Sequence, residues 1–343
     1  MSRLSDAVTQ AWYQNKKWVW CLLPLTLLFG LVSTLRRLGY QKGFFKQVEV
    51  DVPVIIIGNI SVGGTGKSPL TGYLVSELKR RGYKPGIVSR GYGGKSDSYP
   101  VVVDTASFAE VVGDEPLMLH QMTQCPVVVD PVRSRAASKL SQEFGCNVIL
   151  CDDGLQHYAL NRDIEICVID GDRKLGNGFL LPAGPLREPS NRLSSVDYVV
   201  INGERGLENP FSSYLSDDSV FFMSLKPSHL INVFTGQTLE IDNLKGMSIH
   251  ALAGIGNPER FFSALSGLGA NVTPHSFADH HGFIKTDFDF NDNKPVIMTH
   301  KDAVKCQSLY KDSTPANLWY LPVTAELDQS FLDQLTTKLG LLS

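Results

Sequence analysis

The 343-residue chain is 43% hydrophobic and 20% charged, a composition that excludes extensive disorder and suits two lobes. Its formal net charge of −3 excludes the broad positive field of a general nucleic-acid binder, so we expect no nucleic-acid partner and only a local anion site. The six cysteines form neither a CxxC pair nor a Cys/His cluster, so we expect buried thiols in a reducing compartment.

An uncharged apolar run from Trp18 to Leu35 dominates the N-terminal segment, which we assign to residues 1–46. As a helix it would be about 27 Å long, just enough to cross a hydrocarbon core. Basic and aromatic residues flank it and no small-residue cleavage site follows, so we expect a retained membrane anchor. Pro24 and Gly30 leave open a helix that dips into one leaflet, and a buried core helix is the remaining alternative. A slight excess of positive charge after the run favours a cytoplasmic body.

Short β-branched runs alternate with helical patterns from residue 47 to 225. Such alternation predicts an α/β fold, a doubly wound and mostly parallel sheet with crossover helices. We expect strands near residues 53–59, 84–90, 101–104, 125–130, 147–153, 164–170 and 196–202, and helices over 67–81, from 114, and over 131–144.

The texture changes near residue 226, where two alternating runs meet at Thr235 and Gly236. This is a hairpin signal, and we assign residues 226–247 to a β-hairpin linker. The α/β rhythm then restarts in MSIHALAG, PERFFSALSGLG, NVTPHSF, KPVIMT and LWYLPV. Residues 248–343 are therefore predicted to form a second, smaller Rossmann-like lobe.

The segment VIIIGNISVGGTGKSP places a buried strand, a glycine-rich turn and a helix start in succession. Backbone N–H groups and the helix dipole of such a loop cradle the phosphates of ATP. Lys67 would bridge the β- and γ-phosphates and the Ser68 hydroxyl would bind Mg²⁺. Ser61 replaces the first glycine of the usual pattern, and a plain glycine turn is the alternative. The predicted ATP-binding residues are Ser61, Val62, Gly63, Gly64, Thr65, Gly66, Lys67 and Ser68.

An acidic pair, Asp152 and Asp153, ends the apolar run VILC. A strand that delivers a carboxylate beside a phosphate loop is typical of a Mg²⁺ site, so we expect Asp152 to serve the metal with Ser68. Taken alone, the pair could equally be a helix cap or a turn.

Several motifs together resemble one family, the tetraacyldisaccharide 4′-kinases that phosphorylate a lipid A precursor. They span nearly the whole chain and are GNISVGGTGKSP at 58–69, SRGYGG at 89–94, GDEP at 113–116, DDGLQH at 152–157, LPAGPLREP at 181–189, AGIGNPERFF at 253–262, FADHHGF at 277–283 and THKDAVK at 299–305. His300 departs from the family, which often has Glu there.

The resemblance implies a P-loop kinase with two lobes, a membrane helix, MgATP as donor and the 4′-hydroxyl of a tetraacylated glucosamine disaccharide 1-phosphate as acceptor. It implies that Asp114 and His280 are catalytic, although Asp114 could also be a helix N-cap and His281 could exchange roles with His280. It also places Tyr92, Asp153, Arg187 and Glu188 near the substrate or the transition state; an ordinary surface ion pair is the alternative for Arg187 and Glu188.

The predicted function is therefore ATP-dependent phosphorylation of the lipid A precursor by a monomer. The body would lie at the cytoplasmic face of the bacterial inner membrane, with lipid as a partner. The alternative is a membrane-tethered P-loop ATPase that acts as a conformational switch. Such ATPases carry a signature lysine before the paired glycines, where this chain has Val62.

Overall fold

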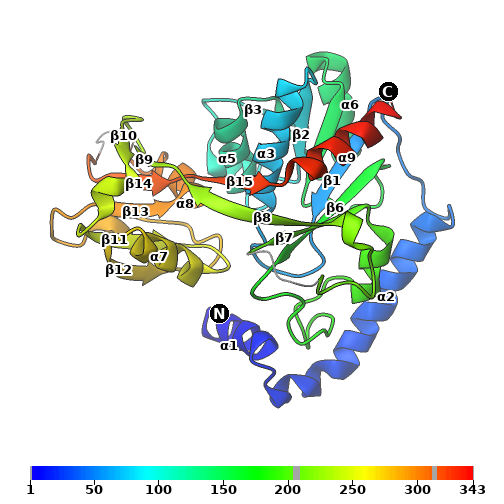
Figure 1. The fold of residues 1–343 in the computed structure, drawn as a ribbon, viewed down its shortest axis with the longest axis horizontal. Helices are drawn as coiled ribbons and strands as arrows, with labels where there is room; N and C mark the ends of the chain where they lie inside the picture. The colour runs from blue at the N-terminus through cyan, green and yellow to red at the C-terminus, as the bar shows by residue number, and fades with distance from the viewer. Residues whose placement is uncertain (1, 204–208, 311–314, 343) are drawn as a thin grey trace.

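The computed structural model describes residues 2–203, 209–310 and 315–342, which build two lobes around two sheets (Figure 1). Within these residues the larger sheet has nine strands in the order β15-β8-β7-β6-β1-β5-β2-β4-β3. Their bounds are β1 Val54–Gly58, β2 Pro85–Ser89, β3 Val101–Val103, β4 Val127–Val129, β5 Val148–Asp152, β6 Ile164–Asp170, β7 Tyr198–Asn202, β8 Val220–Pro227 and β15 Val323–Leu327.

The strands from β8 to β4 run parallel, and only β15 and β3, at the two edges, are antiparallel. Both faces are covered, as parallel sheets require. Ile55 and Ile57 of β1 face a core shared with α3 (Lys67–Arg80), α5 (Asp114–Thr123) and α9 (Gln329–Gly340), whereas Ile56 faces α6 (Arg133–Phe144). The predicted doubly wound sheet is therefore confirmed.

The smaller lobe holds a six-stranded sheet among the described residues, in the order β10-β9-β14-β13-β11-β12. Buried side chains of α7 (Pro258–Gly267) lie in one core of this lobe, and those of α8 (His300–Cys306) lie in another. Its strands are β9 His229–Asn232, β10 Thr238–Glu240, β11 Ser248–Ala253, β12 Asn271–Ser276, β13 Val296–Thr299 and β14 Leu318–Leu321.

The connection between the lobes corrects two assigned boundaries. The expected hairpin forms from β9 and β10, but it is the edge of the smaller sheet, where β9 pairs with β14. The lobes are instead joined by the antiparallel strands β8 and β15. Residues 323–340 therefore return to the larger lobe, because β15 extends its sheet and apolar side chains of α9, including Phe331, are buried in its core.

The N-terminal segment consists of α1 (Ser2–Tyr13), a 3₁₀ turn η1 (Lys17–Leu22) and α2 (Leu23–Gln41). Pro24 lies in the first turn of α2, where the missing N–H costs nothing, and so does not kink the helix. By length and composition the helical stretch from residue 17 to 41 could cross a membrane, with a mean hydropathy of 1.9 and 11% of its most apolar window buried. It runs along the outside of the larger lobe (Figure 1), which is inconsistent with a buried core helix.

The remaining short helices connect these elements. They are α4 Ala109–Val112, η2 Ser190–Ser195, η3 Asp217–Ser219, η4 Ile241–Leu244 and η5 Lys285–Phe288.

Candidate active site

The glycine-rich loop of residues 61–68 links central strand β1 to α3. Its shape depends on glycine at position 66, where φ is +96° and an added Cβ would lie 2.5 Å from Nδ2 of Asn202. Amide side chains on either side fix the backbone: Asn59 Nδ2 donates to the carbonyl of Gly63 at 3.3 Å, and Asn202 Nδ2 donates to that of Thr65 at 3.1 Å. The loop is thus held open as an anion cradle.

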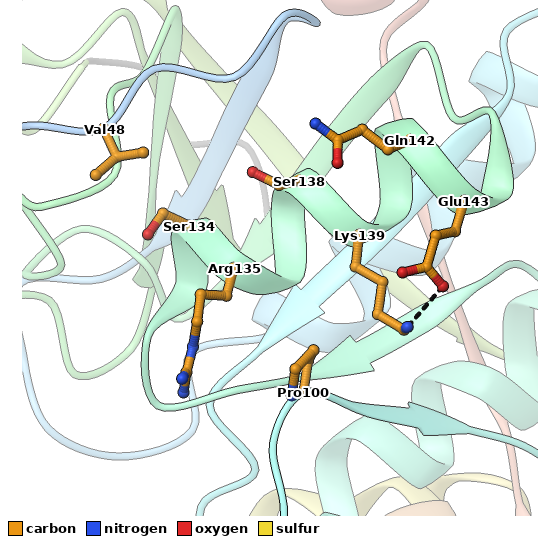
Figure 2. Close-up of a pocket in the computed structure, with 8 residues that line it drawn as sticks. All are labelled: Val48, Pro100, Ser134, Arg135, Ser138, Lys139, Gln142 and Glu143. Atoms are coloured by element: carbon orange, nitrogen blue, oxygen red, sulfur yellow. Dashed lines mark hydrogen bonds and ion pairs between the residues drawn. The ribbon is translucent and has the colours of Figure 1, made fainter.

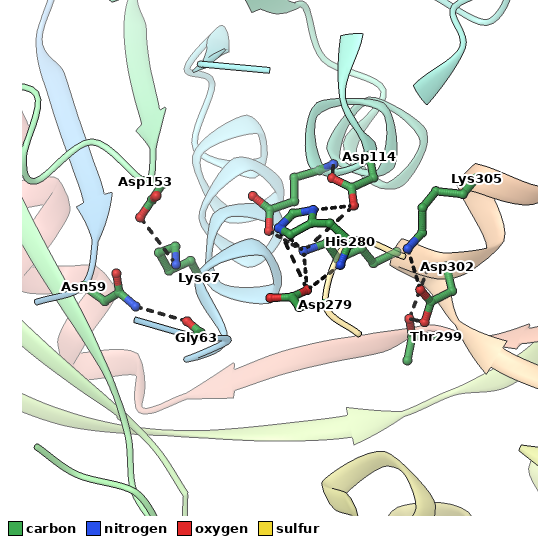
Figure 3. Close-up of polar contacts among 12 residues, drawn as sticks. Asn59, Gly63, Lys67, Asp114, Asp153, Asp279, His280, Thr299, Asp302 and Lys305 are labelled. Atoms are coloured by element: carbon green, nitrogen blue, oxygen red, sulfur yellow. Dashed lines mark hydrogen bonds and ion pairs between the residues drawn. The ribbon is translucent and has the colours of Figure 1, made fainter. Parts of the chain in front are cut away.

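Asp153 contacts two cations beside the loop, Lys67 and Arg187, and Figure 3 shows its pair with Lys67. Lys67 Nζ lies 3.5 Å from its Oδ1, and Arg187 Nη1 lies 3.2 Å from its Oδ2. Burial disfavours the charge, but Lys67 and Arg187 outweigh it and lower the pKa of Asp153 to about 2. Its φ of +48° is rare for a non-glycine residue, and the carbonyl is fixed by Arg133 Nη2 at 3.1 Å.

The segment after residue 180 runs beside the loop, and its neighbouring residues Arg187 and Glu188 have different surroundings. Arg187 N donates to Ile60 O at 2.7 Å, which directs Arg187 toward Asp153. The Glu188 carboxylate instead is buried, where Tyr158 Oη and Gln156 Nε2 donate to it. Arg187 therefore pairs with Asp153 and not with Glu188, and the predicted contacts of both residues with the substrate or the transition state stay predictions.

Asp152 ends β5 beside the loop, because Ile57 of β1 pairs with it in the parallel register. The side chain is 1% exposed, and its Oδ1 has no hydrogen-bond partner among the described residues. Burial, together with the charge of Glu115, raises the pKa of Asp152. A buried, unpaired carboxylate oxygen is strongly disfavoured unless a cation meets it. Asp152 and the hydroxyl of Ser68, at the start of α3, therefore fit Mg²⁺.

The two predicted catalytic residues meet across the lobes (Figure 3). His280 Nδ1, from the smaller lobe, lies 2.9 Å from Oδ2 of Asp114 at the start of α5. Asp114 is not the N-cap, which is Gly113. The hydrogen bond to Asp114 raises the pKa of His280. Burial alone would raise the pKa of Asp114, but the contacts with His280 and Lys301 outweigh it, so the pKa of Asp114 is lowered. His280 also has a positive φ, +58°.

Lys301 of α8 completes this pair, although we assigned it no role from sequence. Its Nζ lies 3.0 Å from Glu115 Oε1 and 3.3 Å from His280 Nε2. Burial alone would lower the pKa of Lys301. The negative charges of Glu115, Asp114 and Asp279 outweigh this effect and raise the pKa, so the ammonium group stays charged. An ammonium group only donates, so Nε2 must accept and the proton of the neutral imidazole must lie on Nδ1. The THKDAVK motif was the available signal.

Tyr92 and His281 border the pair differently. Tyr92 is 63% exposed and its ring centroid lies 4.8 Å from that of His280, so it can line an acceptor site. His281 Nε2 is instead 3.0 Å from Asp287 Oδ2, and its ring packs against Phe277 and Phe283. These contacts favour His280 over His281 as the catalytic histidine.

A separate groove of about 430 Å³ lies on α6 (Figure 2). It contains no predicted site residue, and two of its lining residues, Lys139 and Glu143, pair with each other at 2.6 Å. The lining residues are Val48, Pro100, Ser134, Arg135, Ser138, Lys139, Gln142 and Glu143. The predicted site residues therefore lie at the glycine loop and the His280 pair, not in this groove.

Comparison with known proteins shows the family of the chain. Residues 18–340 match the family described as Tetraacyldisaccharide-1-P 4'-kinase. The chain is 46% identical to the tetraacyldisaccharide 4'-kinase of Methylobacillus flagellatus, covering 96% of this chain and 94% of that protein. It is 44% identical to that of Nitrosococcus oceani, covering 99% and 96%.

A solved structure is also similar, that of LpxK from Aquifex aeolicus in complex with ATP. The TM-score is 0.78 at 29% sequence identity, covering 94% of this chain and 99% of the other. The fold, the ATP donor with Mg²⁺ and the kinase activity agree with our predictions, and nothing favours a switch ATPase. The chain belongs to the tetraacyldisaccharide 4′-kinase family.

Proposed function

We propose that Asp114 and His280 together remove the proton from the acceptor 4′-hydroxyl as this kinase transfers the γ-phosphate of ATP to the lipid A precursor. The observation that carries the proposal is their 2.9 Å contact across the lobes. With its proton on Nδ1 and donated to Asp114, the imidazole keeps Nε2 free to accept a proton. Lys301, now beside Nε2, must move aside for the hydroxyl, and the nearby transferred phosphate offers it a new anionic partner.

On the donor side, Lys67 and Arg187 would exchange Asp153 for the phosphates of ATP. Both now contact Asp153, which keeps them at the mouth of the loop. When ATP binds, its phosphates compete for both cations, and a planar guanidinium can follow the charge that develops during transfer. Ser68 and Asp152 would hold Mg²⁺, whose charge would neutralise the phosphates.

The acceptor's own phosphate is expected on the opposite side of the DDGLQH turn. Burial and then the charges of Arg133, Arg162, Arg36 and Arg90 lower the pKa of His157 to about 4, so these four guanidinium groups lie close enough to this turn to act on it. Arg36 belongs to α2, and its Nη1 donates to Gln156 O at 3.1 Å. We propose that this arginine group attracts the 1-phosphate of the disaccharide.

We also propose that α2 lies in the plane of one leaflet, at the cytoplasmic face of the inner membrane. Thr26 accepts a hydrogen bond from Ala183 N at 3.0 Å, and Arg36 contacts Gln156, so the helix is tied to the body at both points. These residues are about 15 Å apart along the helix axis. A helix attached over this length could cross the bilayer only by drawing the body into it. Its large exposed apolar residues are Leu25, Leu27, Leu28, Leu31, Val32, Leu35 and Leu38.

The site needs only one chain, since Asp114 and His280 belong to the same molecule, and we therefore propose a monomer. The test is to incubate the purified protein with γ-labelled ATP, Mg²⁺ and a tetraacylated disaccharide 1-phosphate in detergent, and then to locate the label. Label at the 4′ position that disappears in His280→Ala supports the proposed base. Full transfer by His280→Ala would refute it without affecting the family assignment.

A further inference from the structure

Arg173 connects three parts of the molecule but has no place in the proposed chemistry. It follows β6, and its Cζ lies 5.1 Å from the ring centroid of Tyr13, the last residue of α1. Its Nη2 donates to Gly256 O of the smaller lobe at 2.9 Å. Its Nη1 lies 3.5 Å from the position a Cβ would take on Gly63. One guanidinium thus touches the N-terminal segment, the glycine loop and the second lobe.

Gly256, the residue whose carbonyl Arg173 contacts, packs against the glycine loop. A Cβ added at Gly256 would be 3.1 Å from Gly64 N and 3.5 Å from Gly63 Cα, so the two backbones meet almost directly. The carbonyl that Arg173 binds is therefore part of the surface that covers the phosphate cradle. Fixing this carbonyl fixes the position of the smaller lobe over the loop.

The N-terminal segment reaches the same loop through a second contact. Ala11, Trp12 and Val19 form a small buried cluster, and Val62 of the glycine loop packs against it. Trp12 Nε1 also donates to Pro182 O at 3.0 Å, which ties the segment to the loop that carries Arg187. Displacement of the segment would therefore release Arg173 and one flank of the phosphate cradle together.

We infer that Arg173 is a positioning residue that couples the seating of the N-terminal segment to closure of the smaller lobe over the glycine loop. Arginine suits this role because its plane stacks on an aromatic ring while its edge donates hydrogen bonds. Coupling of this kind is reciprocal, so the seated segment strengthens ATP binding and ATP stabilises the seated segment. In the cell, a kinase seated beside its lipid acceptor would then bind ATP more tightly than one detached from the bilayer.

The inference depends on the proposed membrane seating only for this last consequence, because its test measures ATP binding in detergent without acceptor. Tyr13→Leu removes the ring while keeping an apolar side chain, and Arg173→Ala removes the guanidinium. Each change should raise the Kd for ATP about fivefold or more. The Kd of the double variant should not exceed that of the single variant that binds ATP less tightly. For transfer, the change should appear mainly in the KM for ATP rather than in kcat.

Tyr40→Leu is the matched control, since Tyr40 also stacks with an arginine, Arg36 at 5.9 Å, but at the far end of the same segment. It should leave the Kd for ATP unchanged. Hydrogen exchange of residues 7–13 should slow on ATP addition in the parent but not in Arg173→Ala. If Arg173→Ala misfolds, Arg173→Lys replaces it in the cycle. Unchanged ATP affinity in Tyr13→Leu, additive losses, or an equal loss in Tyr40→Leu would overturn the inference.

Discussion

Replacing Asp114 with Asn is the sharpest test of the proposed base, because it keeps the shape of the side chain and removes its charge. The 2.9 Å contact with His280 is a hydrogen bond to a charged group, a type that contributes about 1.5–3 kcal/mol. At about 1.4 kcal/mol for each factor of ten, the expected loss in kcat is roughly 10- to 150-fold. The Kd for ATP should change little, since Asp114 contacts the second lobe rather than the glycine loop.

The pH profile of kcat tests the direction in which each neighbour of His280 shifts its pKa. The base must be neutral, so the rate rises with pH through the pKa of His280. Asp114 raises this pKa, and the rising limb should therefore move to lower pH in Asp114→Asn, even as the plateau falls. Lys301 lowers the same pKa, so Lys301→Met should move the limb to higher pH.

His281→Gln is the control for this pair of variants, because His281 contacts Asp287 and not Asp114. It should stay within about tenfold of the parent, a barrier change of ~1.4 kcal/mol. Shifts of the limb in the same direction for Asp114→Asn and Lys301→Met, or a larger loss in His281→Gln than in His280→Ala, would show that the assignment of the base is wrong.

Three further changes test the surrounding parts. Lys67→Ala should nearly abolish phosphoryl transfer while the melting temperature stays close to that of the parent, and activity within about tenfold would contradict the phosphate-loop role. Glu188→Gln should lower the free energy of unfolding by about 1.5–3 kcal/mol in a denaturant titration, because its buried carboxylate accepts hydrogen bonds from Tyr158 and Gln156. Unchanged stability together with lost acceptor affinity would instead support the predicted substrate contact. A triple change of Leu28, Leu31 and Leu35 to Ser should weaken vesicle binding about a thousandfold if each side chain is buried in lipid, and persistent membrane binding would point to another attachment surface.

Local patterns in the chain predicted the elements that depend on local physics. The glycine loop between a buried strand and a helix could be predicted because phosphate binding needs a defined succession of residues. The parallel sheet followed from β-branched runs separated by helices, and the adjacency of Asp152 to the loop followed from the strand that ends there. The apolar run predicted a membrane helix, but its docking on the body through Thr26 and Arg36 depends on contacts far along the chain.

Pairings between distant segments could not be predicted in the same way. The return of residues 323–340 to the larger sheet leaves no local signal, because β15 looks the same whichever sheet it joins. The contact between Asp114 and His280 was predicted only through the family resemblance, and Lys301 was missed because a lysine on a short helix is usually solvated. The family resemblance placed Arg187 and Glu188 together, but their separate surroundings, Asp153 for Arg187 and Tyr158 with Gln156 for Glu188, depend on contacts far along the chain.

The division of the site between two lobes has a consequence for selectivity between acceptor and water. In the proposed mechanism the larger lobe holds the phosphates and supplies Asp114, while His280 and Lys301 belong to the smaller lobe, so transfer would require both lobes to meet over the loop. The larger lobe also carries α2, and if α2 lies in the membrane as proposed, a lipid acceptor would approach from that side. If Arg173 favours the closed arrangement when the N-terminal segment is seated, the base is assembled where lipid hydroxyls are concentrated. A detached enzyme would then bind ATP more weakly and spend less time in the state that could transfer phosphate to water.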